Sequence, residues 1–157
     1  KQIEAYGLKG KLADLAHREQ ARRPFQHLPK QFSKGILIGN IAIVPKKHTG
    51  TRYVYVIADM LEAQILHDDI NLKQTAILVA HYLADGKNIP DNIVEMDMKH
   101  SSQLFDIQSA KRMIREAQKN KDEQMEDVYW DRLDVANRLA DECKANIQQI
   151  FSDTFGA

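Results

Sequence analysis

Apolar residues in the second quarter of the chain fall into three short runs separated by polar turns. The first, GILIGNIAIV (35–44), is rich in β-branched residues, and Gly39-Asn40 at its centre indicates a bulge or a close backbone approach. The second, RYVYVIAD (52–59), has apolar side chains on both faces, which predicts a middle strand covered on both sides. With EAQILHDDI (62–70), the pattern predicts a three-stranded antiparallel meander.

The spacing of apolar residues changes to three or four after residue 70. Asn71, with Gln74 three residues later, has the pattern of a capping box and predicts the start of a helix that Gly86 ends. Two longer stripes follow on either side of the polar break 120–122, so residues 89–157 are predicted to form an antiparallel helical hairpin. The first stripe contains Ile93, Met96, His100, Leu104, Ile107, Ala110, Ile114 and Ala117.

The first third of the chain is predicted to hold a helix and an extended arm. Residues 3–20 have helical spacing, and Pro24 ends the helix. From Pro24 onward the periodicity is lost, and Pro24 and Pro29 favour extended backbone. The expected fold is α+β, with a three-stranded antiparallel meander packed on a helix. The expected segments are an N-terminal helix (1–23), an extended basic arm (24–34), a small α+β core (35–88) and a C-terminal antiparallel helical hairpin (89–157).

A formal net charge of zero conceals an uneven distribution. Residues 1–50 contain ten Lys or Arg and three Asp or Glu, a net charge of +7. Residues 51–157 contain 12 Lys or Arg and 19 Asp or Glu, a net charge of −7. Such a chain is suited to contact an acidic surface or other copies of itself head to tail. The alternative is that the two halves pack on each other.

Several kinds of chemistry lack their sequence signals. Gly35 and Gly39 have neither the lysine nor the spacing of a phosphate-binding loop. The single cysteine, Cys143, excludes a C-x-x-C site and an internal disulfide. No apolar run reaches the ~20 residues of a membrane span, and the first 20 residues contain no apolar core of a signal peptide. We therefore expect no cofactor, no metal site and no membrane contact.

Three acidic or histidine clusters deserve comparison with catalytic or metal sites. His67 and Asp69, with His81, would be needed for a metal or general-base site, but polar strand ends commonly serve solubility and capping. Asp97 and His100 share a helix face, and His100 lies in an apolar stripe, which favours a buried histidine with hydrogen-bond partners. An acidic ridge on the last helix is expected to be a solvated face; it contains Asp127, Asp131 and Asp134. No enzyme is expected.

Nucleic-acid binding is the alternative function. Tyr53 and Tyr55 on one strand face are suited to stack on bases, and the basic residues around them to hold phosphates. The order α-β-β-β-α also matches a double-stranded RNA-binding domain, but only Lys73 stands where that domain has a lysine cluster. The candidate nucleic-acid contacts are Lys30, Lys34, Lys46, Lys47 and Arg52, with Arg22 and Arg23 immediately before the arm.

The arm is predicted to bind protein. Phe25, Leu28 and Phe32 recur every three or four positions on a segment that the prolines keep extended. Leaving such side chains in water costs roughly 1.5–3 kcal/mol each, which burial against protein offsets. An extended segment loses less entropy on docking, and its alternate side chains fill pockets on a neighbour. The predicted partner-binding residues are Arg22, Arg23, Phe25, Leu28 and Phe32.

The stretches AHREQARRPFQHLPKQFSKGILIGNIAIVPKK and QTAILVAHYLADGK, followed by the charged helical hairpin, resemble small uncharacterised proteins of large tailed phages that infect marine bacteria. The resemblance covers nearly the whole chain, and its most specific parts are ARRP and KGxLIGN. It implies a phage context and a component of the virion. Together with the small core and the proline-stiffened arm, it favours a non-enzymatic, capsid-associated structural protein at the head or neck, assembled in the host cytoplasm. It implies phage structural proteins, or copies of the chain itself, as partners, and it supplies no catalytic residues.

Overall fold

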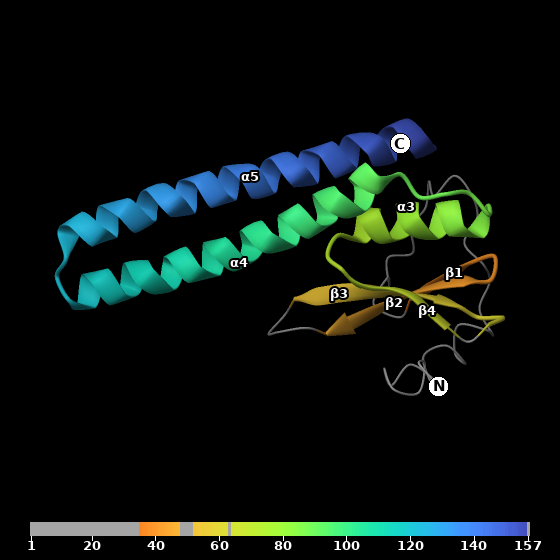
Figure 1. Cartoon of the computed structure of the whole chain (residues 1–157), viewed down its shortest axis with the longest axis horizontal. Coiled ribbons are helices and arrows are strands. Elements are labelled where there is room, and N and C mark those ends of the chain that lie inside the picture. Colours follow the sequence, from red (N-terminus) through yellow and green to blue (C-terminus); the bar gives the residue numbers. More distant parts are fainter. Residues whose placement is uncertain (1–34, 48–51, 63, 157) are drawn as a thin grey trace.

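A four-stranded antiparallel sheet and three helices make up residues 35–47, 52–62 and 64–156, the part of the chain that a computed structural model describes (Figure 1). The predicted N-terminal helix and arm lie outside these residues. The α+β class is as predicted. The elements are β1 (Ile36–Ile38), β2 (Ile41–Lys47), β3 (Tyr53–Asp59), β4 (Gln64–Ile70), α3 (Lys73–Ala84), α4 (Asp91–Lys119) and α5 (Glu123–Phe155).

The sheet has one more strand than the sequence pattern predicted. The run 35–44 does not form a single bulged strand; it turns back at Gly39 and Asn40, so that Ile38 pairs with Ile41. Gly39 has a φ of 59°, a left-handed value that glycine adopts without strain and that suits the first position of a two-residue hairpin turn. The resulting strand order is β1-β2-β3-β4, and every pair is antiparallel.

Both faces of the two central strands are buried, as predicted for the strand at 52–59. On one face, Ile43 and Ile57 pack with α3 in the main core. On the opposite face, a second cluster contains only residues of the sheet and its turns among the described residues: Leu37, Ala42, Val44, Val56 and Ala58, with Met60 and Ile65 beside them.

Strand β4 is irregular at the HDD sequence. Ile57 pairs with His67 while Tyr55 pairs with Ile70, so β4 has one extra residue between these pairs. Asp69, in this extra stretch, has a φ of 55°, and its N–H is 2.8 Å from Oδ1 of Asp68. These are the features of a β-bulge, in which Asp is among the few side chains that tolerate a left-handed φ.

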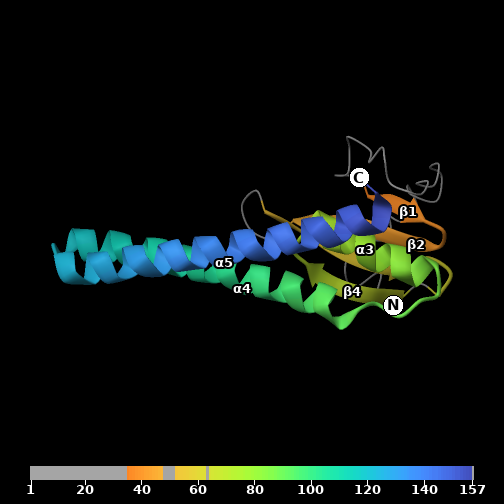
Figure 2. The ribbon, with the colours of Figure 1, turned by 90° about the horizontal axis from the view of Figure 1, so that it is seen from above.

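Helix α3 lies between the sheet and the long helices, as Figures 1 and 2 show. Six consecutive residues of α3, 75–80, are buried, because one side of the helix meets the sheet and the other meets α4 and α5. The main core therefore combines the sheet with Ile93 at the start of α4 and with Ile147 and Phe151 near the end of α5.

The two long helices lie side by side and extend well beyond the sheet (Figures 1 and 2). Their bounds are narrower than the predicted hairpin of residues 89–157, but the predicted break at 120–122 separates them. Asp122 caps α5 by accepting a hydrogen bond from the N–H of Met125 at 3.2 Å. The far part of the pair has its own apolar seam, rich in alanine: Ile107, Ala110, Ile114, Leu133, Ala136 and Ala140.

Candidate functional site

A buried polar cluster fastens α4 to the junction between β4 and α3. Asp97 of α4 is only 4% exposed. Its Oδ2 accepts a hydrogen bond from the N–H of Asn71 at 2.7 Å, and its Oδ1 accepts one from the N–H of Leu72 at 2.8 Å. The start of α3 is therefore capped by a carboxylate from another helix, which satisfies donors that the helix itself cannot pair.

The prediction that Asn71 begins the helix as its capping residue is wrong. Helix α3 begins at Lys73, and neither Asn71 nor Leu72 caps it with a side chain. The Asn71 side chain instead joins two other elements. Its Oδ1 accepts a hydrogen bond from Nη2 of Arg52 at 2.7 Å, and its Nδ2 donates to Nδ1 of His100. Arg52 also reaches Oγ of Ser101 on α4, at 3.3 Å.

The electrostatics of this cluster favour a neutral histidine. Burial lowers the pKa of His100, and the positive charges of Lys144 and Arg52 lower it further, against the opposing effect of Asp97 and Asp141. Burial also disfavours the charged form of Asp97 and so raises the pKa of that carboxyl, although the backbone donors of Asn71 and Leu72 oppose that shift. A neutral ring leaves Nδ1 free to accept the Asn71 hydrogen bond.

The cluster positions secondary structure elements. The Asp97 carboxylate and the His100 Nδ1 are both directed at donors of the chain itself. His100 is 7% exposed, so the prediction of a buried histidine with hydrogen-bond partners is confirmed. No local sequence pattern indicates that Arg52 and Asn71 take part, because these residues are 49 and 29 positions from their partners on α4.

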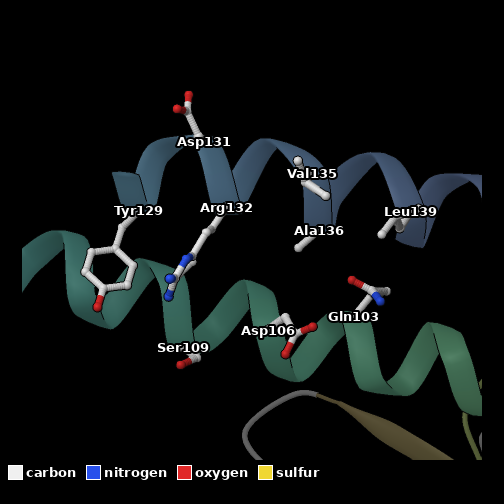
Figure 3. A pocket seen from close by; sticks show the side chains of 10 residues that line it. Gln103, Asp106, Ser109, Tyr129, Asp131, Arg132, Val135, Ala136 and Leu139 are labelled. Carbon is white, nitrogen blue, oxygen red and sulfur yellow. The ribbon is translucent and has the colours of Figure 1, made fainter. Parts of the chain in front are cut away.

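A groove runs between α4 and α5 on the part of the hairpin beyond the sheet (Figure 3). Its volume is about 500 Å³. Residues Ala110 of α4 and Ala136 of α5 are both small and buried at its floor. The remaining lining residues are Gln103, Asp106 and Ser109 of α4, and Tyr129, Asp131, Arg132, Val135 and Leu139 of α5.

One end of the groove is formed by a cation–π pair. The Arg132 guanidinium carbon lies 5.1 Å from the centre of the Tyr129 ring. In Figure 3, Arg132 extends from α5 towards α4 above Ser109, whereas Asp131 points away from α4. The groove thus combines an apolar floor with charged groups at its rim.

The residues considered for a catalytic or metal site are divided between two elements. His67 and Asp69 lie on the irregular strand β4, and burial lowers the pKa of His67. His81 lies on α3, where its ring packs edge-on against Phe155 and its Nε2 is 3.7 Å from the Asp85 carboxylate. Within the described residues, no group of three or more His, Cys, Asp or Glu side chains is arranged to hold a metal ion.

The candidate nucleic-acid contacts are only partly visible. Lys46 and Lys47 end strand β2, where Lys47 is exposed and Lys46 half-buried. Arg52 is engaged with Asn71 and Ser101 instead of projecting into solvent. Tyr53 is 47% exposed, whereas Tyr55 packs against the main core. The other predicted contacts lie outside the described residues, as do the predicted partner-binding positions: Arg22, Arg23, Phe25, Leu28, Lys30, Phe32 and Lys34.

Exposed apolar side chains gather on the hairpin, which the sequence interpretation missed. Of the eight large apolar side chains that are exposed in the described ranges, six lie on α4 and α5: Met98, Phe105, Met125, Val128, Trp130 and Val135. Two pairs, Met98 with Phe105 and Val128 with Val135, are seven residues apart, so each pair occupies one helix face. This spacing was the available signal. In the described part of the chain, no helix has the length and apolar character that crossing a membrane requires.

Comparison with known proteins adds no family to these observations. No protein-family model, no curated protein and no solved structure matches the chain.

Proposed function

We propose that the protein is a non-enzymatic structural component of a phage particle, associated with the head or neck, that joins a larger assembly through protein–protein contacts. The observation that carries the proposal is the concentration of exposed apolar side chains on the projecting hairpin, where Phe105 is 71% and Met98 66% exposed. The phage context rests on the sequence resemblance described above.

The position of these side chains supports binding to protein. Single exposed apolar residues are ordinary, but a series of them along one projecting element is typical of an interaction surface. Aromatic side chains such as Phe105 and Trp130 supply much of the energy at such surfaces. A platform made of the sheet and α3 would then hold the hairpin while its exposed faces meet a neighbour.

The segment predicted to form an extended arm (24–34) is the second proposed contact. Its apolar residues Phe25, Leu28 and Phe32 would fill pockets on a neighbouring protein, with Arg22 and Arg23 immediately before the arm. Phe25→Ala with Phe32→Ala should then weaken attachment more than Arg22→Ala with Arg23→Ala.

Quantitative mass spectrometry of purified phage particles tests the proposal. The protein should be recovered at a fixed ratio to the major structural proteins and should remain after washing at high salt. Recovery only from the soluble fraction of infected cells would refute a structural role. A variant that lacks residues 21–34 tests the arm separately: it should fold but fail to join particles, and normal incorporation would exclude the arm as the attachment.

A further inference from the structure

Helix α5 carries a second apolar stripe beside the one that faces α4. Leu133 and Ala136 pack against α4 and are buried, whereas Val128 and Val135 are 42% and 43% exposed and Leu139 is half-buried. Val128 and Val135 are seven residues apart, and Leu139 follows four residues later, so the three share one face. An apolar arc wider than a single neighbour covers is typical of a helix that packs against two.

The groove gives this second stripe a place for a partner. Val135 and Leu139 line it from α5, and Gln103, Asp106 and Ser109 line it from α4. Because the groove lies between two helices that run side by side, its long direction follows their axes. A third helix fits such a space by packing its ridge of side chains between the two, as in helical bundles.

Charge indicates which helix fits. Helix α5 contains eight acidic residues against three basic ones. Two carboxylates line the groove, Asp131 at its outer rim and Asp106 on its α4 side, against one cation, Arg132, which is paired with the Tyr129 ring. Asp127 and Asp134, which the sequence interpretation assigned to a solvated ridge, are exposed on the same helix. A partner with Lys or Arg beside its apolar stripe would meet this rim with complementary charge.

We infer that the groove between α4 and α5 is the docking site of an amphipathic helix that carries Lys or Arg beside its apolar stripe. The inference rests on the proposed protein-binding function and names the class of partner. The apolar stripe of the partner covers Val135 and Leu139 and completes a three-helix bundle. The lysines or arginines of the partner face Asp106 and Asp131.

A second copy of the same groove is a less suitable occupant. An isologous contact would bring the same surface of two chains together. The acidic α5 of one copy would then face the acidic α5 of the other, and like charges in contact oppose association.

A binding assay with the full-length protein tests the inference. The probe is a fluorescent synthetic helix of about 18 residues, roughly 27 Å long, with Leu at helical spacing and Lys at the flanking positions. One control peptide has the same composition in an order that destroys the stripe, and another has Glu in place of Lys. Binding is measured by fluorescence anisotropy. The protein variants are Val135→Asn, the double variant Asp106→Arg/Asp131→Arg, and Leu61→Asn as a matched control, since Leu61 is 74% exposed but lies outside the hairpin.

The Lys peptide should bind the wild-type protein, and Val135→Asn should weaken it by about tenfold or more, as at a central interface position. The double variant should bind the Lys peptide more weakly, and the Glu peptide more tightly, than the wild-type protein does. Leu61→Asn should leave both affinities unchanged. Equal binding of the shuffled peptide, or an equal loss in Leu61→Asn, would overturn the inference, because binding would then depend on charge alone or on general apolar exposure.

Two further results separate this inference from the proposed function. If the protein is present in particles but binds no Lys peptide, the groove assignment falls while the structural role stands. If analytical ultracentrifugation shows a dimer that Val135→Asn abolishes, the occupant is a second copy and the helix partner is excluded.

Discussion

Asp97→Asn should destabilise the protein far more than an ordinary surface substitution. The side chain keeps its size but offers one oxygen acceptor instead of two and carries no charge. One of the two hydrogen bonds to the start of α3, at 2.7 Å from Asn71 or 2.8 Å from Leu72, is therefore lost. The NH2 group of the introduced asparagine then faces the other backbone N–H, which is left without an acceptor.

The magnitude follows from the loss of one charge-assisted bond in a buried site. Hydrogen bonds to charged groups contribute about 1.5–3 kcal/mol, and an unsatisfied buried donor costs about 1–3 kcal/mol. The variant no longer buries a carboxylate, which offsets part of this cost. We expect a net loss of about 2–3 kcal/mol in the free energy of unfolding. For a chain of this length, that corresponds to a decrease in Tm of roughly 5–10 °C.

Chemical denaturation and hydrogen exchange together measure this effect. The control is Glu95→Gln, which removes an exposed carboxylate from the same helix and should leave the midpoint unchanged. In Asp97→Asn, the amides of Asn71 and Leu72 should exchange faster than those in the middle of α3, because the start of the helix loses its cap first. A midpoint equal to that of Glu95→Gln, with both amides still protected, would show that Asp97 does not hold α3.

Three other variants test neighbouring features. Burial lowers the pKa of His100 in the folded protein, so the unfolded chain takes up a proton first as the pH falls through 6.5, and the free energy of unfolding decreases below that value. Denaturation at about pH 7.5 and about pH 5.5 should therefore show a smaller decrease in the free energy of unfolding for His100→Gln than for the wild-type protein. An equal loss in both proteins would contradict this. Arg52→Met, which removes the bond to Asn71, should cost about 1–2 kcal/mol in the same assay, whereas Lys47→Met should cost nothing measurable. Gly39→Ala should lower stability by about 1–2 kcal/mol, because its φ of 59° strains an alanine; thermal unfolding at the wild-type Tm would contradict that turn geometry.

The helices were predictable because each has a distinct apolar face or a clear interruption. The polar residues 120–122 separate two stripes, and α4 and α5 end and begin on either side of them. The extra strand was not predictable from the same pattern. Residues 36–38 and 41–44 are buried at every position, so the run lacks the alternation of apolar and polar side chains that marks a strand with one solvent-exposed face. Gly39 therefore looked like an irregularity within one strand.

The polar cluster shows why local rules failed at the start of α3. The capping-box pattern of Asn71 and Gln74 considers only neighbours in sequence. In the folded chain a carboxylate 26 positions away caps the helix, and Asn71 is used to connect Arg52 with His100. The face shared by Asp97 and His100 was visible in the sequence. Their partners were not, since nothing local indicates which segment α4 will meet.

The groove also depends on contacts between residues far apart in the sequence, and these contacts connect the hairpin to the polar cluster. Val128 and Val135 mark a second stripe in the sequence, but a groove requires that Ala110 of α4 lie opposite Ala136 of α5. That alignment is set where the helices meet the sheet, by the main core and by the bonds of Asp97. The far part of the hairpin has its own seam and contributes little to the core of the sheet. Substitutions at the rim of the groove can therefore alter binding without unfolding the sheet, whereas loss of Asp97 weakens the base that holds the groove in position.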